Sequence, residues 1–253
     1  MENNFQQETE KLAMTNKQVA DILLRHAAHK DGVITDKGKE QCRQAGENII
    51  KIYADSDKPV IIRRHISNVV VQETGQNRTL NTANLVTQRL LEENERLGYK
   101  KFIFKEEPII ETDLSYGFED DAAKAKMDQL MEKSPELKKI FDNDNYSMWE
   151  SMGPLKILKE QTNTAQAVGE VVNNFVYNHL KEEFTPDFKQ KYGDANVLNL
   201  NFSHEDLLDS AGKETDVFQA GTNANVKNGD MLLCKLYQGN INANYVSNSQ
   251  PTK

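Results

Sequence analysis

Apolar residues in this chain occur in short runs that alternate with stretches of helical spacing. The first run, residues 19–24, is apolar at almost every position, which favours a strand covered on both faces of a sheet. The run stops at Arg25 and His26, and residues 36–53 then show the spacing of an amphipathic helix, with Thr35 as its N-cap. The pattern therefore predicts a buried strand, a loop and a helix, in that order.

The next segment predicts two strands and a second helix. Residues 59–66 and 67–74 are both rich in valine and isoleucine, and the second run is the better candidate for a central strand. Residues 77–98 carry an apolar face at helical spacing and end on Gly98, a residue type that commonly terminates helices. A third strand is expected at residues 101–104.

The second half of the chain is less regular. Residues 106–121 form a turn-rich acidic loop that is expected to contribute to a site, and residues 120–152 are polar with helical patterns. The other predicted elements are a helix at 162–184, a strand at 196–202 that ends on Ser203 and His204, a short helix at 207–211, and a hairpin of 222–227 and 231–237 around the turn Asn228-Gly229-Asp230.

Strands that alternate with helices predict a three-layer α/β/α sandwich with a mostly parallel central sheet. We expect a single domain over residues 17–240, since a chain of 253 residues can bury one full core. Residues 1–16 are interpreted as a flexible N-terminal extension and residues 241–253 as a disordered tail. The segment 120–152 is interpreted as a helical insertion, either a solvated decoration or a lid over the substrate.

Composition excludes several classes of function. The net charge is -8 and no cluster of lysines or arginines is present, so nucleic acid and anionic membranes are not expected as partners. No apolar stretch reaches the roughly 18 residues that span a bilayer, and the polar start does not resemble a signal peptide, so we expect a cytoplasmic protein. Cys42 and Cys234 have no zinc-binding spacing and are interpreted as reduced, space-filling residues.

Histidine follows two of the predicted strands, at His26 and at His204. In a sheet covered on both faces, side chains at the carboxyl ends of strands meet at one edge, where crevices form. Arg78 lies at the start of a predicted helix, where a cation is unfavourable unless it binds an anion. Two arginines and two histidines at such an edge suit a phosphate group, because arginine meets two phosphate oxygens at once and a neutral imidazole is a nucleophile.

Four sequence pieces together resemble the histidine phosphatase superfamily, whose best-known member is phosphoglycerate mutase. They are Arg-His-Ala at 25–27, ITDKGKEQ at 34–41, RTLNTA at 78–83 and Ser-His at 203–204, and the resemblance spans roughly residues 19–237. The order and spacing of the pieces carry the resemblance, because the dipeptide alone recurs at Arg64 and His65.

The resemblance implies a role for six residues. His26 would attack a phosphoryl group and carry it as phosphohistidine, with His204 as the second catalytic histidine of the pocket. A carboxylate four residues before a glycine would be the general acid, which selects Asp113 and Gly117, although Glu111, Glu119 and Glu205 remain alternative proton donors. The phosphate would be bound by Arg25, Arg78 and His204, with Thr74 in the place of a serine that often caps the pocket.

The implied activity is that of a metal-independent histidine phosphatase of the acid type, which hydrolyses a phosphomonoester through the intermediate on His26. Ala27 and Ala28 stand where many members have glycine and glutamate, which disfavours the first alternative, a phosphoglycerate-type phosphomutase. The second alternative is a non-catalytic module that binds a phosphorylated ligand. No cofactor is implied, the partner is a small phosphorylated substrate or a phosphoprotein, and the oligomeric state stays open. His29, His65 and His179 are interpreted as surface or packing residues, with His29 near enough in sequence to line the pocket.

Overall fold

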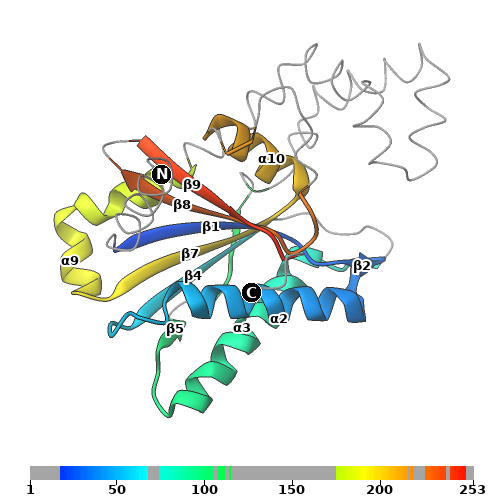
Figure 1. Cartoon of the computed structure of the whole chain (residues 1–253), viewed down its shortest axis with the longest axis horizontal. Coiled ribbons are helices and arrows are strands. Elements are labelled where there is room, and N and C mark those ends of the chain that lie inside the picture. The colour runs from blue at the N-terminus through cyan, green and yellow to red at the C-terminus, as the bar shows by residue number, and fades with distance from the viewer. Residues whose placement is uncertain are drawn as a thin grey trace, which may run out of the picture.

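A computed structural model describes residues 18–67, 74–104, 107–111, 114, 175–215, 217–218, 226–237 and 240–248. Within these residues the protein has a mixed α/β fold in which seven strands form one mostly parallel sheet (Figure 1). The strand order is β5-β4-β7-β1-β8-β9, and β6 pairs with β4. The predicted fold class, with its mostly parallel sheet between helices, is confirmed.

Strand β1 (Val19–Arg25) lies near the middle of the sheet, and its carboxyl end carries the first of the predicted site residues. It pairs in parallel with β7 (Asn196–Ser203), and Arg25 lies opposite Ser203 at the carboxyl ends of both strands. On the other side of β7 runs β4 (Val60–Ser67), also parallel. The carboxyl ends of these three strands therefore meet at the same edge of the sheet.

The remaining strands extend the sheet on both sides. β5 (Phe102–Phe104) and β6 (Ile109–Glu111) are parallel to β4, whereas β8 (Met231–Tyr237) is antiparallel to β1 and β9 (Asn240–Val246) is antiparallel to β8. A separate pair of two-residue strands, β2 (His29–Lys30) and β3 (Val33–Ile34), follows the end of β1.

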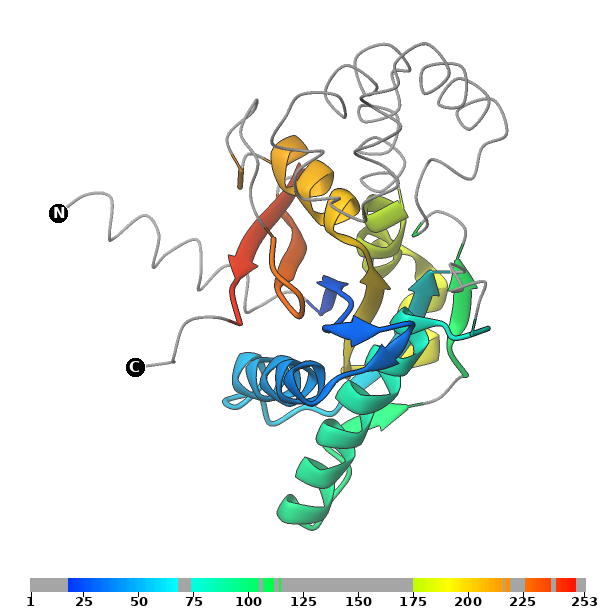
Figure 2. The ribbon, with the colours of Figure 1, turned by 90° about the vertical axis from the view of Figure 1, so that its right-hand side faces the viewer.

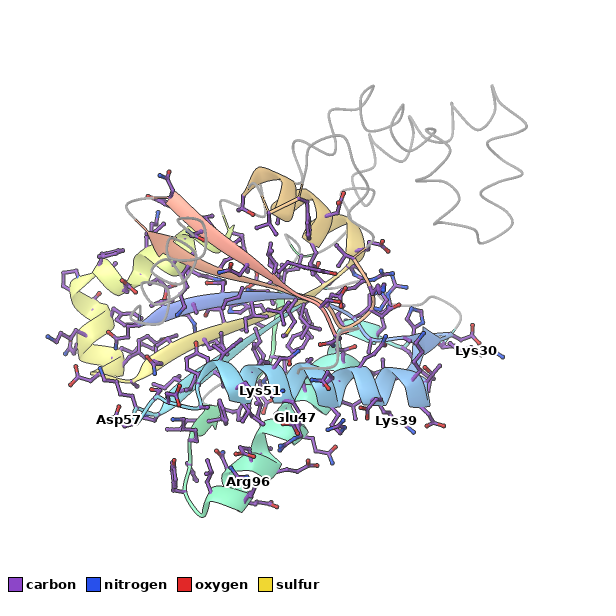
Figure 3. All side chains as sticks on the ribbon, viewed as in Figure 1. Lys30, Lys39, Glu47, Lys51, Asp57 and Arg96 are labelled. Atoms are coloured by element: carbon purple, nitrogen blue, oxygen red, sulfur yellow. The ribbon has the colours of Figure 1, made fainter. Side chains whose placement is uncertain are left out.

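Helices α2 (Asp36–Ile52) and α3 (Arg78–Leu97) pack on one face of the sheet. The backbone N–H of Gly38 donates to the side chain of Thr35 over 3.2 Å, so Thr35 caps α2 as the sequence predicts. Gly98 ends α3 with a φ of 74°, a conformation that glycine adopts without strain. Lys39 and Lys51 lie on the exposed side of α2 (Figure 3), whereas Glu47 accepts a hydrogen bond from Nε of Arg89 of α3 over 2.8 Å.

The opposite face is covered by residues 175–180, which are helical, and by η3 (Lys181–Phe184), α9 (Pro186–Tyr192) and α10 (Glu205–Glu214). The two sets of helices on either side of the sheet make three layers (Figures 1 and 2). Alternate residues of β1 belong to separate cores: Ala20, Ile22 and Leu24 pack toward α2 and α3, whereas Val19 and Leu23 pack toward the other side. Burial on both faces explains why β1 is apolar at almost every position.

Asp21 interrupts this apolar strand and is completely buried. Its carboxylate accepts hydrogen bonds from Asn199 and Asn201 of β7, at 2.9 and 2.8 Å, and a third from Nδ1 of His179 at 2.9 Å. A buried carboxylate is tolerated when donors surround it in this way. The same arrangement ties the helical residues 175–180 to the sheet and accounts for the partly buried position of His179.

The first valine- and isoleucine-rich run forms β4, an interior strand of the sheet. Residues 68–73 lie outside the described residues, so the preference for 67–74 as the central strand stays a prediction. Two other sequence predictions are wrong. The hairpin partner of β8 is β9, whereas Val226 and Lys227 are not in a strand. The predicted disordered tail 241–253 therefore contains most of a strand, in which Ile241, Ala243 and Tyr245 pack against the core between exposed or half-buried asparagines.

Helix α9 was not predicted, and residues 175–184, the described end of the predicted helix 162–184, change from α-helix to 3₁₀-helix at Lys181. The N-terminal extension 1–16 and the insertion 120–152 lie outside the described residues, so both interpretations stay predictions. No helix in the described part of the chain is long and apolar enough to cross a membrane.

Candidate functional site

Four of the predicted site residues come together at the carboxyl edge of the sheet. Arg25 ends β1 and His26 follows it, His204 follows β7, and Arg78 opens α3. The ring centroids of His26 and His204 are 5.3 Å apart, and Nη2 of Arg78 lies 3.3 Å from Nδ1 of His204. The edge thus gathers two imidazoles and two guanidinium groups from three elements that are distant in sequence.

The start of α2 holds the loop that follows His26. The backbone N–H and the hydroxyl of Thr35 both donate to the carbonyl of Ala28, at 3.0 and 3.1 Å, and the side chain of Gln41 accepts from the N–H of Ala28 at 2.9 Å. A Cβ at Gly38 would lie 2.1 Å from that same carbonyl, so only glycine fits there. These contacts give the sequence piece ITDKGKEQ a physical role, which is to fix the backbone beside His26.

His26 is held in one orientation and one tautomer. Its Nδ1 lies 3.0 Å from the carbonyl oxygen of Ala27, which only accepts, so Nδ1 carries the hydrogen and Nε2 keeps its lone pair. The backbone N–H of His26 donates to Ser203 over 2.9 Å, and its carbonyl accepts from Asn228 over 2.9 Å. The N–H of Ala27 donates to Thr82 over 3.0 Å. His26 is only 5% exposed, and its unprotonated nitrogen is Nε2.

His204 has the opposite tautomer. Its Nδ1 faces a guanidinium nitrogen of Arg78, which can only donate, so Nδ1 accepts. Nε2 then carries the hydrogen and donates to the hydroxyl of Ser67, 3.0 Å away at the end of β4. Ser67 was not predicted as a site residue, and no local sequence signal points to it, because the contact joins two strands 137 residues apart.

Electrostatics keeps both imidazoles neutral. Burial lowers the pKa of His26 well below its ordinary value of 6.5, and the nearby positive charge of Arg78 lowers it further. The pKa of His204 is also lowered well below 6.5, first by burial and then by His26 and Arg78. At neutral pH, Nε2 of His26 is therefore unprotonated, close to the positive charges of Arg78 and Arg25.

Arg25 lies next to Glu205, which the sequence predicts only as an alternative proton donor. Its Nη1 lies 2.6 Å from a carboxylate oxygen of Glu205 and also donates to the carbonyl of Val226. Four acids were considered as proton donors, and two of them, Glu205 and Glu111, belong to the described residues. Of these two, Glu205 lies beside Arg25. Glu111 instead accepts from Nδ1 of His65, 2.9 Å away, and Asp113 and Glu119 lie outside the described residues.

Thr74 is exposed, and its hydroxyl donates to the backbone carbonyl of Asp31 over 2.8 Å. This contact links the residue before α3 to the turn between β2 and β3, and the predicted role of Thr74 in capping the phosphate stays a prediction. Arg64 and His65, the second arginine-histidine pair, lie within β4 rather than after a strand, so they do not form a comparable site.

His29 is the other residue that the sequence predictions left outside the site. Its ring centroid lies 5.0 Å from that of His26, and its Nε2 lies 3.2 Å from Nη1 of Arg78. The spacing of three residues from His26 was the only signal for it. Within the described residues, no group of three histidine, cysteine, aspartate or glutamate side chains is arranged to hold a metal ion.

No protein-family model matches the chain, and no curated protein matches it in sequence. Solved structures do resemble it in fold. A phosphoglycerate mutase from Bacillus anthracis str. Sterne is 13% identical, with a TM-score of 0.48, over 93% of this chain and 96% of its own. The α-ribazole phosphatase from Shigella flexneri is 17% identical, with a TM-score of 0.44, over 92% and 99%.

The protein histidine phosphatase SixA, solved with tungstate, is 13% identical with a TM-score of 0.45, over 90% of this chain and 97% of its own. These neighbours carry the names of two phosphatases and of a mutase. The likeness is one of fold, and the functional argument rests on the residues of the site.

Proposed function

We propose that the protein is a phosphatase that hydrolyses a phosphomonoester through a phosphohistidine intermediate on Nε2 of His26. The observation that supports this most directly is the hydrogen bond from Nδ1 of His26 to Ala27, which leaves the lone pair on Nε2. The lowered pKa of the same ring keeps that nitrogen unprotonated at neutral pH. A fixed, neutral imidazole beside two arginines is what attack on a phosphoryl group requires.

The first step transfers the phosphoryl group to the enzyme. Arg25 and Arg78 bind the phosphate oxygens, and their fixed charges stabilise the negative charge that spreads over these oxygens in the transition state. Nε2 of His26 forms a bond to phosphorus while the bond to the ester oxygen breaks. The departing oxygen takes a proton from a carboxylic acid, because an unprotonated alkoxide is a poor leaving group.

The second step regenerates the enzyme. A water molecule attacks phosphorus and gives its proton to the carboxylate formed in the first step. The bond between phosphorus and Nε2 breaks, and the lone pair returns to His26. Inorganic phosphate leaves, and the neutral imidazole and the protonated acid are restored. Neither step needs a redox change or an external base, and the proposed chemistry proceeds without a metal or a cofactor.

The proposed partner is a small phosphorylated molecule, and hydrolysis is favoured over phosphomutase activity by the charge of the pocket. A mutase holds a doubly phosphorylated intermediate, which needs cations in excess. Here Glu205 pairs with Arg25 at 2.6 Å, so one carboxylate already faces an arginine of the pocket. Such a charge disfavours a second phosphate group.

Replacement of His26 tests the proposal. His26→Ala is expected to lower turnover of an aryl phosphate by about 10³-fold or more, since the nucleophile is lost. Rapid acid and base quenches of the wild-type enzyme with radiolabelled substrate are expected to show a phosphoenzyme that is labile in acid and stable in base. The matched control is His65→Gln, which removes the histidine of the second arginine-histidine pair and is expected to retain activity below its melting temperature.

Turnover by His26→Ala at the wild-type rate would refute the mechanism. Release of no phosphate from a broad panel of phosphomonoesters, together with tight phosphate binding, would instead identify a non-catalytic module. Movement of phosphate between hydroxyl groups without its release would identify a mutase. Each of the three activities therefore has a separate readout.

A further inference from the structure

Each ring nitrogen of His29 lies next to a hydrogen-bond donor, one from Gly32 and one from Arg78. The backbone N–H of Gly32 points at Nδ1 of His29 over 3.3 Å, and Nη1 of Arg78 lies 3.2 Å from Nε2 of the same ring. Both neighbours are donors. A neutral imidazole has one N–H and one lone pair, so it accepts from only one of them and presents a hydrogen to the other.

An oxygen anion resolves this conflict. When Nδ1 accepts from Gly32, the ring hydrogen is on Nε2 and points toward the guanidinium of Arg78, which is also a donor. An oxygen beside the pair, within hydrogen-bond reach of both nitrogens, would accept from Nε2–H and from Nη1–H together. Charge-assisted hydrogen bonds of this kind are shorter and stronger than neutral ones. The pair is therefore arranged to share an anion.

The surroundings of His29 determine its charge. The charged and titratable groups around it are Arg78 of α3, Arg25 and His26 at the end of β1, His204 after β7, and Asp31 in the turn between β2 and β3. Burial and then Arg78 lower the pKa of His29, and Asp31 opposes them. The ring is thus neutral without a bound anion, and a doubly charged anion beside it reverses the sign of its main electrostatic interaction.

We propose that His29 is an imidazole ligand of the bound phosphoryl group, and that it takes up a proton when the anion binds. The inference rests on the proposed function, because the ligand it assigns is the phosphoryl group of that same pocket. Proton uptake and anion affinity are thermodynamically linked. The anion therefore binds more tightly as the pH falls, over the range in which His29 is neutral without the anion and protonated with it. His29 thereby makes substrate affinity dependent on pH and selects dianions over monoanions.

Calorimetric titration with sulfate tests the proposal on the full-length protein. Sulfate stays a dianion between about pH 5.5 and pH 8, so any proton taken up on binding is bound by the protein. Titrations in buffers of different ionisation enthalpy give the number of protons bound with each anion. Wild type is expected to take up protons when it binds sulfate. His29→Gln is expected to take up fewer, by about half a proton or more, and to bind sulfate about tenfold more weakly at pH 6.

Two further variants separate a ligand from a structural residue. His29→Lys keeps a permanent cation and is expected to bind sulfate more tightly than His29→Gln, with the same reduced proton uptake. Lys30→Gln removes a charge from the next residue of β2, whose exposed side chain lies at the outer end of the strand (Figure 3), and is expected to match wild type in proton uptake. Melting temperatures of all variants, measured without sulfate, exclude those that are not folded.

The outcomes distinguish the two proposals. Equal proton uptake by wild type and His29→Gln, or an equal loss of affinity at pH 6 and pH 8, would overturn the role of His29 while the phosphate pocket stands. An absence of sulfate binding to the wild-type protein would overturn the phosphate pocket itself, and with it the role of His29. Weak binding by His29→Lys, no better than by His29→Gln, would show that the imidazole acts structurally.

Discussion

The carboxylate of Glu205 lies 2.6 Å from the guanidinium of Arg25, and both side chains are largely buried, with exposed fractions of 18% and 19%. This pairing places a negative charge next to the group that the proposed mechanism uses to bind phosphate. An incoming phosphate therefore either shares Arg25 with the carboxylate or displaces it. The pairing sets an electrostatic cost on anion binding in this pocket.

Glu205→Gln is therefore expected to tighten product inhibition. Loss of the carboxylate frees Arg25 for phosphate, and we expect the inhibition constant of inorganic phosphate to fall by about three- to tenfold. The measurement is inhibition of aryl phosphate hydrolysis at pH 7. Glu92→Gln, which removes one charge from the exposed side of α3, is the matched control. Unchanged or weaker inhibition of Glu205→Gln would show that the carboxylate supports phosphate binding.

The proton donor is identified by its dependence on the leaving group. The aryl oxide of an aryl phosphate leaves without protonation, whereas the departing alkoxide of an alkyl phosphate needs a proton. Asp113→Asn is expected to lower turnover of an alkyl phosphate by about 10²-fold and of an aryl phosphate far less. Glu205→Gln is expected to change both substrates by a similar factor. The reverse result would assign proton donation to Glu205.

The sequence predicts correctly those parts of the site that depend on local structure. The apolar run 19–24 stops where β1 ends, at Arg25, and the predicted strand 196–202 stops where β7 ends, at Ser203. Thr35 and Gly98 mark helix ends through local side-chain and backbone chemistry, which is readable without tertiary information. Once strand ends are known and the sheet is taken as parallel, His26 and His204 are expected at one edge.

Contacts between distant elements were not predictable in this way. The pairs Arg25–Glu205 and Arg78–His29 arise only when four elements, β1, α10, α3 and β2, fold onto each other. Asp21 also escaped prediction, since one acid in an apolar run gives no sign that asparagines on β7 will surround it. A carboxylate is acceptable at that position only because of partners 178 and 180 residues away.

Strand β9 shows a different limit of the sequence pattern. Asn240–Val246 alternates asparagine with apolar residues over most of its length, which is the period of a half-buried strand. The segment lies near the end of the chain, and the prediction of a disordered tail rested on that position. Pairing with β8 supplies the backbone hydrogen bonds that intrinsic propensity does not.

Ser67 is expected to position His204, and Ser67→Ala tests this. The variant leaves Nε2–H of His204 without this acceptor in a buried site, which costs about 1–3 kcal/mol of stability. It also frees the ring to rotate or change tautomer, so turnover at saturating substrate is expected to fall about tenfold or more. The measurements are urea unfolding and steady-state kinetics.

Ser203→Ala is the matched control for that variant. Ser203 is also a buried serine at a strand end, and its hydroxyl donates to the carbonyl of Leu114 over 2.8 Å rather than to the pocket. We expect it to lose stability without a comparable loss of turnover. Equal losses of turnover in the two serine variants would mean that general destabilisation, and not the orientation of His204, accounts for the effect.

The buried histidines also predict how stability depends on pH. Burial lowers the pKa of His26 and of His204 below 6.5, the ordinary value that applies in the unfolded chain. Below pH 6.5 the unfolded chain therefore binds protons that the folded protein does not, and the free energy of unfolding decreases as the pH falls toward the folded pKa values. The slope approaches about 1.4 kcal/mol per pH unit for each such histidine.

Urea unfolding at pH 7.5, 6.5 and 5.5 in a buffer without phosphate or sulfate measures this dependence. His65 and His29 have lowered pKa values as well and act in the same direction. His204→Gln removes one of these titrations, so its stability is expected to fall less steeply between pH 6.5 and pH 5.5 than that of wild type. Stability that stays constant or rises over this interval would show that the pocket histidines are protonated in the folded protein, a state in which His26 is not a nucleophile.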